Sequence, residues 1–80
     1  MKVKILFFGM AKDLAGESSD SLHVDEKVNI RVFRNILQEK YPLFSQMDSF
    51  SIAVNETYAE EDLILVENDI VAVIPPVSGG

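Results

Sequence analysis

Residues 70–74 form an uninterrupted run of five apolar side chains, and Pro75-Pro76 follows it directly. The run is preceded by Asn68-Asp69, two residue types that favour turns. A short apolar run bounded by turn formers is typical of a central strand that is buried on one face and covered or bound by a partner on the other. Because side chains alternate along a strand, Val71 and Val73 share one face and are expected to point toward a helix. The chain is therefore expected to fold around this segment as the middle of a sheet.

A single segment of the chain shows a clear helical period. It begins after Asn29, a plausible N-cap, and Pro42 is expected to end it because proline disfavours helical geometry in the residue before it. Its polar residues gather on one side, so the helix is expected to cover one sheet face. The expected buried stripe consists of Val32, Phe33, Ile36, Leu37 and Tyr41.

The remaining strands are short. Residues 2–8 and 21–25 alternate apolar and polar side chains, and the loop between them holds a possible helical turn at 11–15 closed by Gly16. Residues 51–54 predict a third strand, with a turn leading into 57–59. Inward-facing positions are expected to be Val3, Ile5, Phe7, Leu22, Val24, Ile52 and Val54, with Leu63 and Leu65 holding the later loop to the core.

This order, β-β-α-β-β, predicts an α+β fold of the β-grasp, ubiquitin-like type. We expect a mixed sheet of four to five strands with one main helix packed on one face. Residues 1–76 would form the domain and residues 77–80 a flexible tail. A ferredoxin-like split βαβ or a small α+β sandwich would need a second full helix, for which only the short segment 61–65 remains.

Composition excludes several classes of function. The 80 residues hold no cysteine, so neither disulfides nor a thiolate metal site is expected, and a cytoplasmic setting fits. A net charge of −6 argues against nucleic acid as a partner, and no apolar run is long enough for a membrane span. The acidic balance favours a partner with a basic face, although solubility alone would also account for it.

The chain ends in Val77-Ser78-Gly79-Gly80. Two glycines form a thread of backbone that can enter a narrow passage, so we expect the α-carboxylate of Gly80 to be the working group. Four extended residues span roughly 13 Å, enough to reach a partner's pocket while the sheet stays docked outside. The alternative is a frayed end without function.

Three segments resemble the small subunit of molybdopterin synthase, the MoaD-like sulfur carriers. These are the opening strand and loop over residues 6–16, the hairpin over 54–58, and the C-terminal segment over 69–80. The resemblance spans the whole chain, and the closing Pro-Pro-Val-Ser-Gly-Gly is its most specific part.

The resemblance implies a sulfur carrier for molybdenum cofactor biosynthesis, with no catalytic side chains of its own. An adenylyltransferase similar to the ubiquitin-activating enzyme would use ATP and Mg to adenylylate Gly80. A sulfurtransferase would then convert the acyl-adenylate to a thiocarboxylate. The tail would enter the large subunit of molybdopterin synthase, in a heterotetramer, and donate sulfur to a cyclic pyranopterin precursor.

The resemblance also implies a docking surface, formed by Phe8, Tyr58 and Ile74 together with the prolines 75 and 76. The alternative is that these side chains cover a small satellite core. No bound cofactor or metal site is expected: His23 is interpreted as structural or surface, and the acidic run 60–62 as a solvated turn. Asn68 stands where many members have glycine, but asparagine also accepts left-handed geometry.

Other carriers of this type remain alternatives. A carrier for another thiolation pathway would use the same thiocarboxylate, although thiazole carriers are shorter and lack the opening segment found here. A ubiquitin-like modifier would instead join Gly80 to lysines of other proteins. A passive β-grasp adaptor would tolerate loss of the tail, and a plant-type ferredoxin is excluded by the lack of cysteine.

Overall fold

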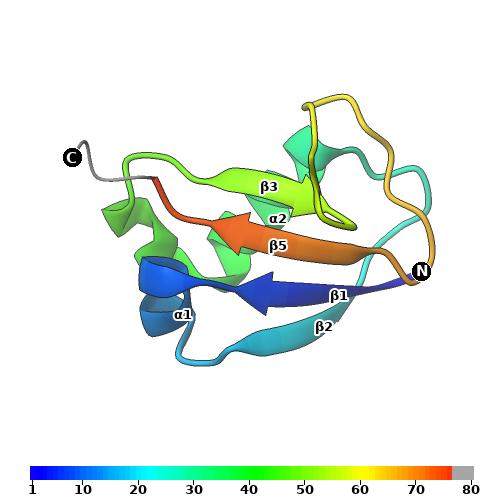
Figure 1. The fold of residues 1–80 in the computed structure, drawn as a ribbon. Coiled ribbons are helices and arrows are strands. Elements are labelled where there is room, and N and C mark those ends of the chain that lie inside the picture. The colour runs from blue at the N-terminus through cyan, green and yellow to red at the C-terminus, as the bar shows by residue number, and fades with distance from the viewer. Residues whose placement is uncertain (77–80) are drawn as a thin grey trace.

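The computed structural model describes residues 1–76, and residues 77–80 lie outside this description. The described part is one sheet with helices packed behind it and at one end (Figure 1). Its elements are β1 (Lys2–Phe7), α1 (Gly9–Ala15), β2 (Ser19–His23), α2 (Ile30–Lys40), the 3₁₀ helix η1 (Pro42–Gln46), β3 (Ser51–Val54), β4 (Thr57–Tyr58) and β5 (Ile70–Ile74).

The five strands lie in the order β2-β1-β5-β3-β4. β5 runs parallel to β1 and antiparallel to β3, so the sheet is mixed, and the last strand in the sequence is the central one. The outer pairs, β1 with β2 and β3 with β4, are antiparallel. The predicted β-grasp arrangement and the central position of residues 70–74 are thus confirmed.

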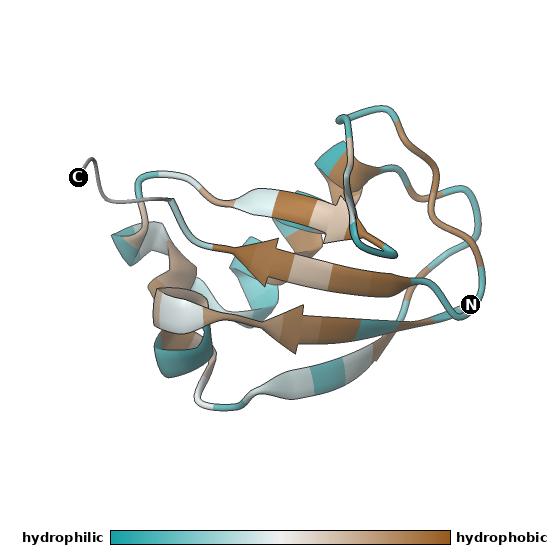
Figure 2. Ribbon diagram, in the orientation of Figure 1, coloured by the Kyte–Doolittle hydropathy of each residue, from teal (hydrophilic) through white to brown (hydrophobic). Residues whose placement is uncertain are grey.

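The main core lies between the sheet and α2, which crosses behind it in Figure 1. The alternation along the strands decides which side chains enter this core, and Figure 2 shows the apolar segments concentrated in β1, β3 and β5. The fully buried side chains with the largest volumes are Phe33, Phe44, Ile5, Ile30, Leu37, Ile52, Leu65, Val3, Val71 and Val73.

The ends of α2 follow local sequence signals. Asn29 is the N-cap, and its Oδ1 accepts a hydrogen bond from the backbone N–H of Val32 at 2.9 Å. Pro42 ends the helix as expected, but it also opens η1, which the sequence did not predict and which brings Phe44 into the core. The expected position of Val32 in the buried stripe is wrong: Ile30 occupies the core instead, and Val32 is 45% exposed.

Two turns require left-handed backbone. Asn55 and Glu56 have φ values of 51° and 73°, the geometry of a tight hairpin turn matching the twist of β3 and β4. Asn68 has φ 70°, so asparagine does adopt the left-handed geometry expected there. The buried carboxylate of Asp69 accepts hydrogen bonds from the Asn55 side-chain amide at 2.9 Å and from the backbone N–H of Val66 at 2.8 Å. These contacts tie the hairpin to the start of β5.

Three further features differ from the sequence prediction. The predicted helical turn is a full helix, α1, closed by Gly16 with φ 78°. β2 begins at Ser19 rather than residue 21, because its backbone pairs with β1 and needs no apolar side chain to do so. Leu63 is largely exposed, and only Leu65 anchors the later loop in the core. Among residues 1–76, no helix has the length and apolar character needed to cross a membrane.

Candidate functional site

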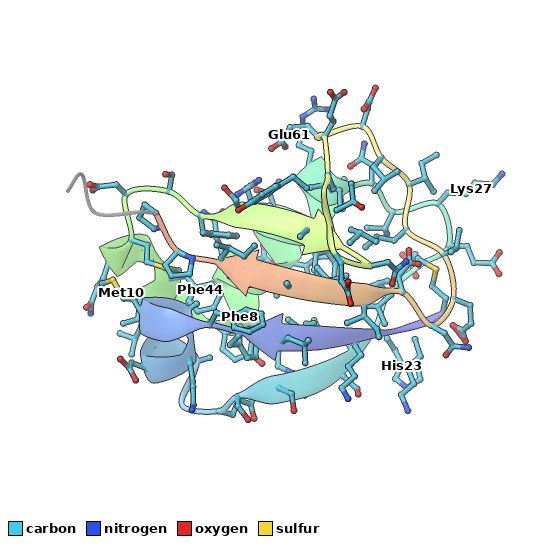
Figure 3. The ribbon with its side chains drawn as sticks, in the orientation of Figure 1. Phe8, Met10, His23, Lys27, Phe44 and Glu61 are labelled. Carbon is cyan, nitrogen blue, oxygen red and sulfur yellow. The ribbon has the colours of Figure 1, made fainter. Side chains whose placement is uncertain are left out.

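The face of the sheet opposite α2 is open, and Figure 3 looks onto it. Apolar side chains from four strands and the β1–α1 junction surround a hollow of about 420 Å³ on this face. Its floor is formed by two alanines that pair across neighbouring strands, Ala53 and Ala72. Larger side chains rise around these alanines. The lining residues are Leu6, Phe8, Ala53, Glu56, Tyr58, Ile70, Ala72 and Ile74.

Phe8, Tyr58 and Ile74, predicted from separate segments of the sequence, meet around this hollow. Phe8 is 49% exposed and Tyr58 is 70% exposed. Ile74 is partly buried at the end of β5. Exposed aromatic and aliphatic side chains that converge on one hollow are typical of a protein-binding surface.

Phe8 occupies an unusual position for an aromatic residue. It is the N-cap of α1, with extended backbone, and its side chain makes no capping hydrogen bond. Serine, threonine, aspartate or asparagine would cap the helix better. The ring therefore contributes nothing to the helix end and is free on the open face (Figure 3).

The base of the C-terminal segment is packed against this junction. Gly9 has φ 51°, and a Cβ built on it would lie 3.3 Å from Cγ of Pro75. The backbone N–H of Phe8 donates to the carbonyl of Val73 at 3.3 Å. Pro75 is partly buried and Pro76 is exposed, so the chain leaves the domain beside Phe8. The expected tail residues, Val77, Ser78, Gly79 and Gly80, lie outside the described residues.

The most perturbed titratable group lies away from this surface. The Tyr41 hydroxyl contacts Glu17 Oε1 at 2.8 Å and Asp20 Oδ2 at 2.5 Å. Burial, followed by these hydrogen bonds, raises the pKa of Tyr41 above its usual value, while the hydrogen bond from Tyr41 lowers the pKa of Asp20. Lys40 pairs with the same Asp20 carboxylate at 3.0 Å. This cluster fastens the edge strand β2 to the end of α2, and we interpret it as structural.

No group of three or more potential metal ligands gathers within residues 1–76. His23 is exposed on the edge strand β2. Sequence reasoning missed Leu6, Ala53 and Ala72 as parts of the hollow. Ala53 carried a signal, because it points away from the face of Ile52 and Val54, but its pairing with Ala72 depends on the register between distant strands.

A comparison with known protein families shows which family the chain belongs to. The model described as "ThiS family" matches residues 5–80, nearly the whole sequence. The chain belongs to the ThiS family. Several curated proteins are also similar to this chain over most or all of their length, and they share one name.

Two of these relatives are named "Molybdopterin synthase sulfur carrier subunit". The protein from Caenorhabditis briggsae is 35% identical, with 100% of this chain and 99% of the relative covered. The protein from Dictyostelium discoideum is 37% identical, with 96% of this chain and 94% of the relative covered. The resemblance inferred from the sequence is therefore confirmed.

Solved structures agree with the fold. The structure titled "Putative molybdopterin converting factor, subunit 1" from Pyrococcus furiosus has a TM-score of 0.88 at 28% identity, covering 96% of this chain and 99% of that one. A complex of subunits 1 and 2 of molybdopterin-converting factor from Helicobacter pylori has a TM-score of 0.70 at 28% identity, with full coverage of both chains. The small archaeal modifier protein SAMP1 from Haloferax volcanii, at 21% identity, fully covers both chains and shares the fold with a TM-score of 0.87.

Proposed function

We propose that this protein is the sulfur carrier subunit of molybdopterin synthase and that the α-carboxylate of Gly80 carries the sulfur. The similarity to relatives of that name, over the full length of both chains, is the observation that carries the proposal. The open apolar face beside Pro75 supports it, because a carrier must dock while its C-terminal segment extends into a partner.

The chemistry needs activation before sulfur can be added, because a carboxylate is a poor electrophile. ATP would convert the Gly80 carboxylate to an acyl-adenylate, releasing pyrophosphate. A persulfide on the sulfurtransferase would attack the acyl carbon and displace AMP, and a thiol would then cleave the S–S bond of the resulting acyl disulfide, releasing the thiocarboxylate and forming a disulfide. The thiocarboxylate sulfur would bond to a carbon of the pyranopterin precursor and displace an oxygen substituent, giving a thioester. Water would then cleave the acyl C–S bond, which leaves the sulfur on the pterin and returns the Gly80 carboxylate.

None of these steps calls for a side chain of this protein. The sequence has no cysteine that could carry sulfur itself. ATP and Mg would be bound by the activating enzyme, so we propose that this chain is not an enzyme on its own. Its contribution is to present Gly80 from a rigid base formed by Gly9, Pro75 and the central strand.

The large subunit of molybdopterin synthase is the proposed partner for the open face. The Helicobacter pylori structure is titled as a complex of subunits 1 and 2, and its similarity to this chain supports such a pairing. We propose that Phe8, Tyr58 and Ile74 form the docking surface and that residues 77–80 enter the partner. Two carriers with two large subunits would give a heterotetramer.

The test is the intact mass of the protein from cells with an active sulfur supply. A mass increase equal to the replacement of one oxygen by sulfur, abolished by deletion of Gly80, is expected. A variant extended beyond Gly80 should fold normally and fail to convert the pyranopterin precursor. Pterin conversion by the extended variant would contradict the proposal, and a ladder of protein conjugates would indicate a modifier instead.

A further inference from the structure

The open face changes character toward the start of β1. Lys2 and Lys4 line a second hollow of about 420 Å³, together with Ser21, Asn68 and Ile70. Because side chains alternate along a strand, both lysines point to the same side as Leu6. Ile70 lines both this hollow and the apolar one, so the two form a continuous surface.

The charge on this surface is opposite in sign to that of the whole protein. The chain carries a net charge of −6, yet no acidic side chain of residues 1–76 lines the second hollow. Glu56 is the one acidic residue lining the apolar hollow. The nearby Glu67 carboxylate accepts a hydrogen bond from the backbone N–H of Lys2 rather than pairing with an ammonium group.

Both lysines are exposed and take no part in the ion pairs formed within residues 1–76. Their side chains leave the strand two residues apart, which places their bases about 7 Å from each other. Two unpaired ammonium groups beside an apolar hollow are complementary to carboxylates on a protein whose apolar surface fills that hollow.

We propose that the docking surface extends along β1 to Lys4 and Lys2, and that the large subunit carries carboxylates opposite these two ammonium groups. This inference rests on the proposed function, since it specifies the surface chemistry of that partner. It refines the expectation of a partner with a basic face: the partner surface over β1 is acidic.

The position of the two lysines suggests that their contact with the large subunit orients the domain. They lie at the opposite end of the open face from Pro75, where the chain leaves the domain. Lys4 and Phe8 are separated by about 13 Å along the strand. An apolar hollow alone would restrain rotation of the domain on its partner only weakly, whereas ion pairs at this distance would fix the orientation of the domain on the large subunit.

The test compares Lys4→Glu with Lys27→Glu in binding to the large subunit. Lys27 is a matched control because it is exposed at the same end of the molecule but lies in the loop before α2, away from the open face (Figure 3). We expect Lys4→Glu to lower the association rate constant about tenfold at low salt and Lys27→Glu to lower it less than about twofold. At about 1 M salt the two variants should converge, because charges are then screened within about 3 Å.

Lys4→Gln provides a second variant that adds no repulsion, and its association rate should fall between those of wild type and Lys4→Glu. If Lys4→Glu and Lys27→Glu had equal association rate constants while the wild type bound the large subunit and transferred sulfur, the inference would be overturned and the proposed function would stand. Absence of wild-type binding to the large subunit would overturn the proposed function with it. If Lys4→Glu lost the binding of inorganic phosphate but associated with the large subunit as fast as wild type, the lysines would bind a small anion and the inference would be wrong.

Discussion

Val71 and Val73 on β5 are fully buried against α2, whereas Ile70, on the same strand, is 44% exposed on the other side of the sheet. The two faces thus use similar aliphatic side chains in different ways. On the covered face every large side chain has neighbours within the domain, so burial there stabilises the fold. On the open face the large side chains stand around a floor of two alanines and have contacts to gain from a partner. The difference separates residues that hold the fold from residues available for docking.

The difference between the two faces is tested most strongly by removing one aromatic ring from each of them. Phe33→Ala removes a fully buried ring and should lower the free energy of unfolding by about 3–5 kcal/mol. Phe8→Ala removes a half-exposed ring and should lower it by less than about 1 kcal/mol, while weakening binding to the large subunit. Urea unfolding measures the first effect and titration calorimetry the second. Equal losses of stability would show that the open face belongs to the core.

Tyr41, at the edge of the covered face, is expected to contribute a smaller amount to the free energy of unfolding than Phe33. Tyr41→Phe removes the hydroxyl that contacts Glu17 and Asp20, and should lower the free energy of unfolding by about 1–2 kcal/mol at neutral pH. Because burial and the hydrogen bonds to the two carboxylates raise the pKa of Tyr41 above the usual tyrosine value of 10.0, the wild type should lose stability as pH rises above 10. The variant lacks this group, so the stability difference between the two proteins should shrink there.

The hydrogen bond between Tyr41 and Asp20 also makes stability depend on pH in the acidic range, where stability is lost as pH falls. The hydrogen bond from Tyr41 lowers the folded-state pKa of Asp20 below the usual aspartate value of 3.8, so this contribution is present above that pH and lost as pH falls further. Urea unfolding at pH 7, pH 11 and pH 3 measures both limits. A stability difference that stays constant across this range would mean that the hydroxyl does not interact with the carboxylates.

The smallest expected change in stability concerns Phe8 on the open face. Phe8→Asp and Phe8→Ala both remove the ring, but aspartate can cap α1 and place a negative charge at its N-terminus. Phe8→Asp should therefore be about 1 kcal/mol more stable than Phe8→Ala, while both variants bind the large subunit weakly. If Phe8→Asp were the less stable variant, the open N-cap would not explain why this position is free for docking.

The parts of the structure that depend on local signals were predictable. The apolar run at residues 70–74 predicted the central strand, and Asn29 and Pro42 predicted the ends of α2. The family resemblance indicated Phe8, Tyr58 and Ile74 as docking positions, and the structure brings them together. Their role in docking stays a prediction.

The parts that depend on distant contacts were not predictable. The start of β2 is set by backbone pairing with β1 and by the Tyr41–Asp20 hydrogen bond across 21 positions of sequence. η1 forms where Phe44 can pack against Phe7 and Phe50, a neighbourhood that exists only in the folded molecule. The lysine end of the docking surface was likewise hidden, because Ser21, Asn68 and Lys4 meet only through strand order.

The parallel pairing of β1 with β5 has a consequence for synthesis of the protein. β5 leaves the ribosome after the other four strands, yet it occupies the middle of the sheet, between β1 and β3. Without β5 the β1–β2 and β3–β4 pairs would not be joined, because β5 is the strand that pairs with both β1 and β3. Its pairing with β1 connects residues near the two ends of the described chain, and such distant contacts form slowly. The site where Pro75 meets Gly9 therefore exists only once the sheet is complete. A copy with an incomplete sheet lacks this contact, and we expect it to dock less well than the folded protein.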